Sequence, residues 1–359
     1  MTDSNSKTVP RIIPHPDLER FIDSAFVACG LPPADAAIVA GLMTLADLRG
    51  SDGHGVFRLA QYVKRIKAGG INVTPNIRIV SERKAQALVD GDNGMGHLVV
   101  ARAAEIAIAK AKETGIAWVG VRMSNHAGPA ALYASMPLAH DMIGLYAAMG
   151  SANHLPPWGG TEMLLSTNPI AIAVPGAERP PIVLDMATTT AAYGKVKMAL
   201  QRGEQMPVGW MIDKQGQPLT DPARAGEGFL LPIGGPKGYG LALMLGLLTG
   251  TLNGAAFGAK VIDFNADSQS VTNTGQFIAA LDIAAFADVA EFKREVDQVW
   301  AEMKSSPLMP GFDKVRLPGE SAHGIEVGRR RTGIPIGPEL DRQLHGLASE
   351  LGIAALSTR

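Results

Sequence analysis

Cysteine is nearly absent from this sequence of 359 residues, because Cys29 is the only one. A lone cysteine cannot form a disulfide within the chain, and Cys29 lacks sequence neighbours that would activate it as a nucleophile. We therefore expect a buried thiol on an apolar helical stretch. Residues 1–17 are mostly polar and lack the apolar core of a signal peptide. Both features predict a reducing compartment, most simply the cytoplasm.

A surplus of positive charge is also missing, since 33 Lys and Arg residues face 34 Asp and Glu residues. The chain therefore cannot neutralise many backbone phosphates, and nucleic acid is not an expected partner. The longest apolar run, residues 239–248, is shorter than the ~20 residues that cross a bilayer, so no membrane association is expected. The histidines show neither H-E-x-x-H nor paired-cysteine spacing, and we expect no metal site.

The apolar residues that are present, 46% of the sequence, are enough for a large buried core. Their pattern predicts helices at residues 16–28, 33–48 and 56–67, followed by strands that alternate with helices. Such alternation is typical of an α/β fold with at least one face of the sheet covered. The later strands are expected at 77–80, 87–90, 116–121, 143–148, 170–174, 182–184 and 276–282, and the later helices at 97–113, 129–140, 239–252, 288–304 and 338–351. The helix at 239–252 is almost wholly apolar and is expected to be buried.

Two glycine-rich segments could hold phosphate groups. Residues 91–96 precede a helix, but their glycine spacing is not G-x-G-x-x-G and no Rossmann strand–turn–helix unit begins there, so a plain turn is the alternative. In the second segment Gly234 and Gly235 expose backbone amides, Lys237 adds a positive charge, and the following helix directs its positive end at the loop. This arrangement suits a pyrophosphate, although an ordinary glycine-rich helix start has the same sequence.

A titratable cluster lies between the second and third predicted helices. His54 follows Asp52-Gly53, and Arg58 and Tyr62 come one and two helical turns later. Residues four apart share a helix face, so both side chains can point towards the loop that carries His54. A guanidinium binds a carboxylate and an imidazole gives a proton to a carbonyl, which are the groups that reduction of a 2-oxo acid needs. A loop histidine and a surface arginine are the alternative.

Polar residues also follow several predicted strands, where ligands of α/β folds gather. Ser124, Asn125 and His126 come after the strand at 116–121, and Thr167-Asn168 lies at another strand edge. Asp185 falls within an apolar run, where an unpaired carboxylate is costly to bury. It either caps a helix beginning near Thr188 or takes part in the chemistry.

In their order along the chain, these segments resemble one family. The motifs are ADLRGSDGHGVFRLAQY, DGDNGMGH, VRMSNHAG, PWGGTEMLLSTNPIAIAVP, IVLDMAT, GWMIDKQGQP, LPIGGPKGYGLALM and LPGE, across roughly residues 15–345. They are similar to those of the type 2 malate/lactate dehydrogenase family. That family also contains ureidoglycolate dehydrogenase, sulfolactate dehydrogenase, diketogulonate reductase and piperideine-2-carboxylate reductase.

The resemblance implies an α/β fold and a homodimer. It implies a non-Rossmann NAD(P)-binding domain on a mixed sheet, at residues 76–236 with about 256–284. A helical substrate and dimer domain would combine the two ends of the chain, residues 1–75 with about 237–255 and 285–359. The cofactor would be NAD or NADP.

The resemblance also implies roles for individual residues. His54 resembles the acid/base histidine, His126 a second active-site histidine, and Arg58 lies where the substrate carboxylate is held, with Tyr62 beside it. Which histidine carries the proton stays open. The cofactor contacts, with Asp185 also a catalytic candidate, would be Ser124, Asn125, Thr167, Asn168, Asp185, Met186, Ala187, Gly234, Gly235, Lys237, Gly319 and Glu320.

Two departures from the family pattern affect what can be carried over. Many members have serine where this chain has Gly53, and the lost hydroxyl makes the transfer of any member's substrate unsafe. Ser166 stands where glycine is usual, which alters the local turn at most.

The sequence thus predicts an NAD(P)-dependent oxidoreductase that interconverts a small 2-oxo acid and its 2-hydroxy acid, with a small carboxylate as its partner. One alternative keeps the cofactor but reduces a cyclic imine carboxylate. An alternative of another class is a ligand-binding protein on the same fold without catalysis. The substrate, the physiological direction and the choice between NAD and NADP are not fixed by the sequence.

Overall fold

The computed structural model describes residues 10–356, except the side chain of residue 201. The chain divides into two compact units, Met1–Gly69 with Ser321–Arg359, here called the helical unit, and Gly70–Glu320, the sheet unit. The helical unit thus combines the two ends of the chain. Residues 237–255 and 285–320, which the sequence analysis assigns to the helical domain, belong to the sheet unit in this division.

The helical unit is built on α1 and α2, which pack against each other. Both helices have a proline in the first turn, where the missing N–H removes no helical hydrogen bond. Gly30 follows α1 with a φ of +95°, the left-handed conformation expected at the end of this helix. The elements of the unit are β1 (Arg11–Ile13), α1 (His15–Ala28), α2 (Pro33–Leu48), α3 (Leu59–Lys67), α9 (Glu320–Thr332), β13 (Ile334–Ile336) and α10 (Pro338–Leu351).

Cys29 differs from its prediction. It lies at the end of α1 and is half-buried rather than buried. The burial that it has raises the pKa of its thiol above the ordinary value. Cys29 is therefore a protonated, partly accessible thiol at neutral pH.

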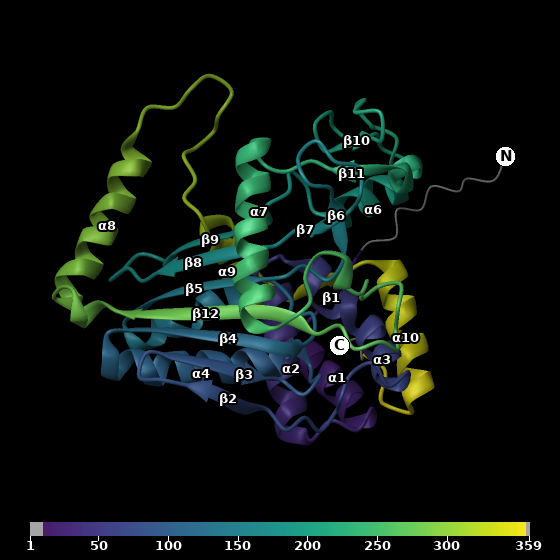
Figure 1. The fold of residues 1–359 in the computed structure, drawn as a ribbon, viewed down its shortest axis with the longest axis horizontal. Coiled ribbons are helices and arrows are strands. Elements are labelled where there is room, and N and C mark those ends of the chain that lie inside the picture. The colour runs from purple at the N-terminus through teal and green to yellow at the C-terminus, as the bar shows by residue number, and fades with distance from the viewer. Residues whose placement is uncertain (1–9, 357–359) are drawn as a thin grey trace. The chain divides into compact units, whose positions relative to one another are not determined.

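The sheet unit is organised around a seven-stranded mixed sheet in the order β2-β3-β4-β12-β5-β8-β9 (Figure 1). Only β3 and β4 pair in parallel, and every other pair is antiparallel. The strands predicted from the sequence are confirmed. Their bounds are β2 Arg78–Glu82, β3 Gln86–Asp90, β4 Ile116–Ser124, β5 Met142–Ala148, β8 Ile170–Val174, β9 Ile182–Met186 and β12 Thr274–Asp282.

Helices cover both faces of this sheet. Helix α4 (Gly96–Thr114) packs on the central strands β4 and β12, while α7 (Pro236–Thr249) crosses the strands on the other face (Figure 1). Under α7, the rings of Trp118 and Phe277 stack with centroids 3.8 Å apart. The core of the unit therefore lies on both sides of strands β4 and β12.

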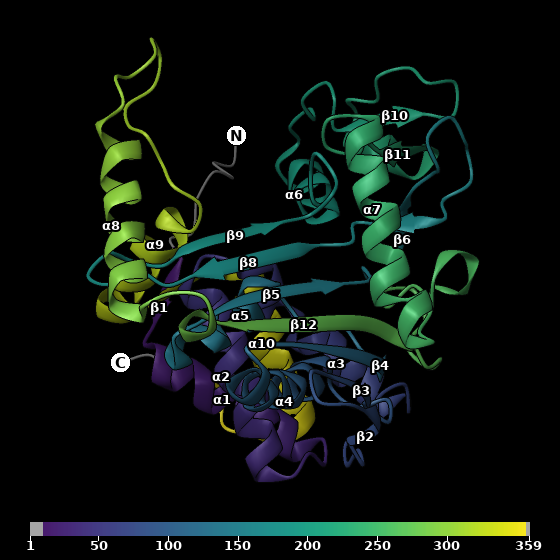
Figure 2. The same cartoon turned by 60° about the vertical axis from the view of Figure 1, so that its left-hand side comes forward.

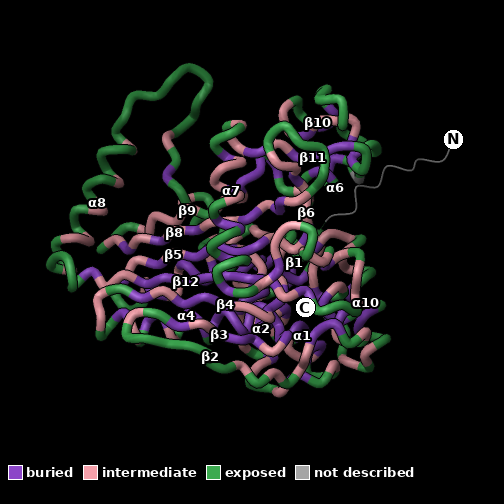
Figure 3. Tube along the Cα trace, in the orientation of Figure 1, coloured by how far each residue is buried: buried purple, intermediate pink, exposed green. Residues whose placement is uncertain are grey.

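Helix α7 corrects one prediction, because it is buried on one side only. Met244 is 51% exposed, Leu247 36% and Leu248 37%, whereas Ala242 and Leu245 are buried (Figure 3). The sheet lies on one side of the helix, so an all-apolar sequence leaves the remaining side chains at the surface. An exposed apolar stripe of this kind is typical of a contact surface.

A second helix prediction is also corrected. The helix expected at residues 129–140 is instead a short helix, α5 (Ala131–Ala134), followed by a 3-10 turn at Met136–His140. Pro137 lies at the start of that turn. Proline lacks the N–H that a continuous helix would need at this position.

Several elements of the sheet unit do not follow from the sequence pattern. Residues 193–230 form a small cluster with its own core, which includes Val196, Met206 and Leu230. Figure 2 shows α8 and this cluster at opposite ends of the long strands. The elements concerned are β6 (Asn153–Leu155), β7 (Leu165–Ser166), α6 (Tyr193–Arg202), β10 (Met211–Asp213) and β11 (Gly228–Leu230). Helix α8 (Val289–Ser305), in contrast, was predicted from the sequence.

Candidate functional site

The predicted cluster in the helical unit forms one compact segment. Two 3-10 turns, Asp52–His54 and Val56–Arg58, join α2 to α3. The Nε of Arg58 donates a hydrogen bond of 3.0 Å to the carbonyl of Gly53, so the guanidinium folds back onto the loop that carries His54. The predicted approach of Arg58 to this loop is therefore observed.

The electrostatics of this segment set the protonation state of His54. His54 is partly buried, and this burial, together with the positive charge of Arg58, lowers the pKa of its imidazole from 6.5 to about 4. The ring is therefore neutral at neutral pH. A neutral imidazole can accept a proton or a hydrogen bond from a substrate hydroxyl.

Tyr62 occupies a different environment from Arg58. It is fully buried, and its ring lies 6.4 Å from that of Phe26 in the helical core. Burial raises the pKa of its phenol well above the ordinary value. Tyr62 thus packs beneath the segment, and its contact with a substrate stays a prediction.

The groups that support this segment, Asp47 and Arg329, were not predicted from the sequence. Asp47, in the last turn of α2, is 2% exposed, and burial raises its pKa from 3.8 to about 8. Arg329 of α9 donates hydrogen bonds to the Asp47 carbonyl and to the Asp52 carboxylate. An acidic residue within an apolar helical turn was the available signal for Asp47. No sequence signal indicated Arg329, because its partners lie at the other end of the chain.

His126 lies just after β4 in the sheet unit, as predicted. Its ring is 5.5 Å from that of Phe264, and the N–H of Gly128 donates to its Nδ1 at 3.5 Å. The preceding residues, Ser124 and Asn125, are fully buried. The side-chain amide of Asn125 donates hydrogen bonds to Asn93 and Gly94. The main-chain carbonyl of Asn125 accepts a bond of 3.0 Å from the side chain of Gln276, so the segment before His126 is held rigidly.

Thr167 and Asn168 join β7 to β8. The Asn168 side chain is fully buried, accepts the N–H of Gly150 at 3.1 Å and donates to the carbonyl of Ala242 at 2.8 Å. The carbonyl of Thr167 accepts both the N–H and the hydroxyl of Thr188, each at 2.9 Å. These groups shape the loop, and a cofactor contact through their side chains stays a prediction.

Asp185 and Met186 lie in β9 at the edge of the sheet, followed by Ala187. Asp185 retains exposed surface although it falls within an apolar run, and its carboxylate accepts the N–H of Ala131 at 2.9 Å. The surrounding chain still removes enough water to raise the pKa of this carboxyl. The helix expected near Thr188 is absent from this stretch, since α6 begins at Tyr193. Asp185 caps the start of α5 instead.

The Gly234-Gly235 segment precedes α7, as predicted. Both residues have a positive φ, +58° and +65°, and a Cβ at Gly234 would meet nothing within 4 Å. Lys237 is exposed in the first turn of this 14-residue helix. Open backbone, a helix N-terminus and a lysine fit the negative charge of a dinucleotide diphosphate.

Pro318, Gly319 and Glu320 pass along the edge strand β9. The carbonyl of Pro318 accepts the N–H of Val183 at 3.1 Å, and a Cβ at Gly319 would lie 2.9 Å from that of Val183. The Glu320 carboxylate accepts bonds from Lys304 at 2.6 Å and from a backbone N–H at 3.0 Å. The bond from Lys304 lowers the pKa of Glu320, which stays ionised.

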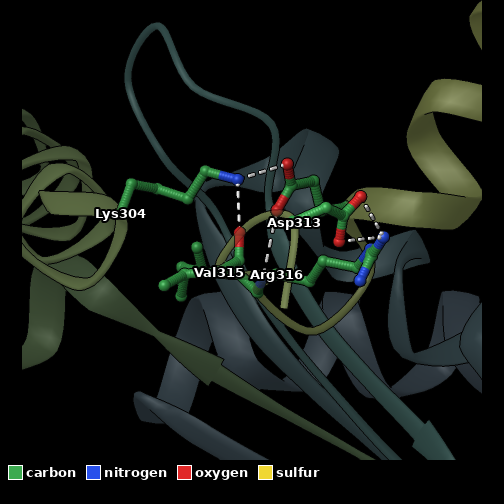
Figure 4. Close-up of polar contacts among 6 residues, drawn as sticks. Lys304, Asp313, Val315 and Arg316 are labelled. Atoms are coloured by element: carbon green, nitrogen blue, oxygen red, sulfur yellow. Dashed lines mark hydrogen bonds and ion pairs between the residues drawn. The ribbon is translucent and has the colours of Figure 1, made fainter. Parts of the chain in front are cut away.

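Side chains hold the stretch between α8 and Pro318 in place. Lys304, in the last turn of α8, also donates to the carbonyl of Val315 at 2.7 Å, and Arg316 pairs with Asp313 at 3.0 Å (Figure 4). These contacts fix the approach of Gly319 to β9. The predicted cofactor loops at Asp185 and Gly319 are therefore neighbours on the same strand edge.

Two general findings apply to residues 10–356. No group of three or more His, Cys, Asp or Glu side chains in this range is placed to hold a metal ion. No helix in the same range is both long and apolar enough to cross a membrane.

Comparison with known proteins gives a consistent result. The chain is 41% identical to the L-sulfolactate dehydrogenase of Methanocaldococcus jannaschii over 324 residues, which are 90% of this chain and 92% of that protein. It is 38% identical to the malate dehydrogenase of Pyrococcus horikoshii over 352 residues, 96% of each chain.

Solved structures agree. The M. jannaschii sulfolactate dehydrogenase superposes with a TM-score of 0.89 at 39% identity, covering 96% of this chain and 98% of that chain. The Δ1-piperideine-2-carboxylate reductase of Pseudomonas syringae pvar. tomato superposes with a TM-score of 0.81 at 28% identity, covering 94% and 100%. The sequence profile of the malate/L-lactate dehydrogenase family matches residues 13–345. The chain belongs to the malate/L-lactate dehydrogenase family.

Proposed function

We propose that this chain is an NAD(P)-dependent oxidoreductase that interconverts a small 2-oxo acid and the corresponding 2-hydroxy acid. The observation that carries the proposal is the Asp52–Arg58 segment, which holds a neutral histidine and an arginine on one short stretch of chain. Malate and sulfolactate, named for two relatives, are both 2-hydroxy carboxylates. Such substrates require a cation for the carboxylate and a proton carrier for the oxygen at C2.

Arg58 is the proposed carboxylate ligand. The bond from its Nε to the Gly53 carbonyl orients the plane of the guanidinium. A guanidinium held in this way binds a carboxylate through parallel N–H bonds, which fixes the position and the rotation of the substrate. Tyr62 supports Arg58 from below in this proposal.

His54 is the proposed proton carrier. Its neutral ring takes the proton of the C2 hydroxyl during oxidation, and the protonated ring returns it to the carbonyl oxygen during reduction. The bound nicotinamide supplies or accepts the hydride. His126 is the alternative proton carrier. Asp185, also in the sheet unit, is proposed to take part in catalysis.

NAD or NADP is the cofactor, as in the family. We propose that the sheet unit binds it on this largely antiparallel sheet rather than on a Rossmann domain. Gly234, Gly235 and Lys237 would hold the diphosphate. The remaining proposed contacts are Ser124, Asn125, Thr167, Asn168, Asp185, Met186, Ala187, Gly319 and Glu320.

A second substrate class is favoured by one observation, the structural similarity to the piperideine-2-carboxylate reductase. A cyclic imine carboxylate offers the same carboxylate to Arg58, with a C=N bond in place of C=O. Comparing the turnover of pyruvate and oxaloacetate with that of piperideine-2-carboxylate separates the two classes.

We also propose that the chain is a homodimer in the cytoplasm. The exposed apolar side chains of α7, Met244, Leu247 and Leu248, support a protein contact. The single cysteine supports a reducing compartment. Sedimentation equilibrium tests the dimer, since a monomer mass at micromolar concentration would contradict it.

The experiment that tests the function is oxidation of NADH and NADPH against a panel of acids, followed by the absorbance of the reduced nicotinamide. The panel contains pyruvate, oxaloacetate, sulfopyruvate, diketogulonate and cyclic imine acids. We expect turnover with at least one 2-oxo acid and loss of that turnover in His54→Ala. No turnover of any acid, with the cofactor bound, would contradict the proposal.

A further inference from the structure

The Asp52–Arg58 segment is short and irregular. It consists of two 3-10 turns of three residues each, with backbone bonds from His54 to Ser51 at 2.8 Å, from Arg58 to Gly55 at 2.9 Å and from Leu59 to Val56. The hydrogen-bond geometry of a 3-10 turn is poorer than that of an α-helix. Contacts from outside the segment therefore help to fix the positions of His54 and Arg58.

Asp47 anchors the segment from inside the helical unit. Its buried carboxyl accepts the N–H of Val56 at 2.8 Å. A Cβ at Gly55 would lie only 2.0 Å from the Asp47 Oδ1, so the backbone of Gly55 rests directly on this carboxyl group. Residues 55 and 56 lie between His54 and Arg58, and their position determines that of both side chains.

Arg329 anchors the segment from its other side. Its guanidinium donates to the carbonyl of Asp47 and pairs with both carboxylate oxygens of Asp52, with the second bond at 3.2 Å. The Arg329 side chain is only 15% exposed. One guanidinium therefore joins the end of α2 to the first residue of the segment, which a lysine with a single charged nitrogen cannot reproduce.

The helix that carries Arg329 is itself fixed against α2. Arg49 pairs with Glu326 at 2.9 Å, and Glu326 also pairs with Arg330 at 2.6 Å. Gly50, with a φ of +77°, leaves room for Ile325, which would lie 2.9 Å from a Cβ at this position. The backbone of α9 that carries Arg329 is thus held in place against α2.

We propose that Arg329 is a positioning residue, which together with Asp47 holds the Asp52–Arg58 segment in the conformation that the proposed reaction uses. The inference rests on the proposed function, because it assigns the segment's geometry to the roles of His54 and Arg58. Arg329 acts through the segment and contacts no reacting atom in this proposal. The C-terminal part of the chain thereby controls the chemistry of the N-terminal part.

The test compares Arg329→Gln and Arg329→Lys with the control Arg331→Gln. Arg331 is an exposed arginine two residues further along α9, so its substitution removes the same charge from the same helix. Three quantities are measured for each variant: hydrogen exchange of the amides at residues 52–58, binding of NADH by fluorescence, and steady-state kinetics with the best acid of the panel. NADH deuterated at C4 gives the primary isotope effect on kcat.

For Arg329→Gln we expect faster exchange at residues 52–58 and unchanged NADH binding. We also expect a fall in kcat/KM of roughly 10- to 100-fold, since small displacements of catalytic groups have effects of this size. The isotope effect on kcat should rise, because misplaced groups slow the chemical step itself. Arg329→Lys should show the same changes to a smaller degree, and Arg331→Gln none of them.

Other results would overturn the inference. A purely structural role would lower kcat in proportion to the folded fraction, with KM and the isotope effect unchanged. Unchanged exchange at residues 52–58 would show that Arg329 does not hold the segment. If Arg329→Gln fails to fold, Arg329→Lys decides by the same readouts. A wild-type chain that reduces no acid would instead contradict the proposed function, while exchange still reports on the anchor.

Discussion

At the scale of single residues, the proton-carrier role proposed for His54 depends on the downward shift of its pKa. Most histidines that gain an acidic partner become easier to protonate, whereas burial and the charge of Arg58 make His54 harder to protonate. Its lowered pKa suits a base that accepts a proton at neutral pH. The neutral ring of His54 is the form that oxidation of the hydroxy acid requires.

The pH profile of oxidation tests this assignment. Because the His54 pKa is lowered to about 4, kcat/KM for the hydroxy acid should be level from about pH 5.5 to neutrality and fall only at more acidic pH, where the ring becomes protonated. The measurement is kcat/KM against pH with the preferred acid. An acid limb centred near ~6.5, the ordinary histidine value, would assign the proton to another group.

Arg58 can be tested by a substitution that keeps its charge. Arg58→Lys replaces two parallel N–H bonds to a carboxylate by one, so KM for the acid should rise roughly 10- to 100-fold, with a smaller change in kcat. Arg20→Lys, on the exposed side of α1, is the matched control and should leave both constants unchanged. An unchanged KM in Arg58→Lys would remove Arg58 from the substrate site.

Individual residues were predictable where the chemistry lies within a few residues of sequence. The return of Arg58 to the His54 loop follows from helical spacing, and the structure confirms it. The role of Asp185 in the chemistry stays a prediction, but its expected cap of a helix near Thr188 was wrong, because its partner Ala131 is distant in sequence and no local pattern indicates it. Arg329 was missed for the same reason.

At the scale of elements, the joint between α2 and α3 depends on a close contact. Glycine is required at position 55 because Asp47 lies against it, where a Cβ would be only 2.0 Å from the Asp47 Oδ1. Gly53, two residues earlier, faces open space.

Two glycine substitutions are therefore expected to differ in their effect on the free energy of unfolding. Gly55→Ala should destabilise the helical unit by about 1–3 kcal/mol through overpacking and should lower kcat/KM strongly. Gly53→Ala should leave the unfolding free energy unchanged, because a Cβ there meets nothing within 4 Å. Urea unfolding measures both. Equal stability of the two variants would contradict the close packing of Gly55 on Asp47.

Element positions were predictable where the hydrophobic period is clear, as for α1, α2 and the strands of the large sheet. The burial of α7 was overestimated, because composition does not reveal how many sides of a helix are covered. The short pairs β6–β7 and β10–β11 have two or three residues per strand, too few for a recognisable alternation. The pair β10–β11 belongs to the small core around Val196 and Leu230, which includes Met211 of β10.

At the scale of the whole molecule, the two ends of the chain form one unit, and a buried carboxyl lies inside it. Burial raises the pKa of Asp47 to about 8, with Asp52 raising it further and Arg329 and the Val56 N–H opposing the shift. The folded state therefore binds this proton more tightly than the unfolded state. Its contribution to stability is complete below about pH 4 and is lost as the pH rises towards 8.

Asp47→Asn isolates that contribution. The amide keeps an acceptor for the Val56 N–H but does not titrate, so its unfolding free energy should lack the decline between about pH 4 and 8 that Asp47 gives the wild type. From the pKa shift, the decline is on the order of 6 kcal/mol at most. The lowered pKa of His54 acts in the opposite sense in both proteins and cancels in the comparison. Parallel curves would show that Asp47 is ionised at pH 7.

The assignment of the chain to its family was available from the sequence, because eight collinear motifs are spread along much of its length. The division into units was not, since 237–255 and 285–320 join the sheet unit through contacts that no local pattern specifies. The identity of the substrate likewise depends on the groups around Arg58. The amino-acid composition does not reveal which groups these are.

The most direct test of the central claim follows the hydrogen rather than the rate. The protein is incubated with pyruvate, oxaloacetate or sulfopyruvate and with reduced cofactor deuterated at both C4 positions, and the acids formed are analysed by mass spectrometry. The proposed reaction predicts a 2-hydroxy acid with one deuterium at C2. Cofactor binding without any deuterated 2-hydroxy acid, from these or from any other 2-oxo acid of the panel, would contradict it.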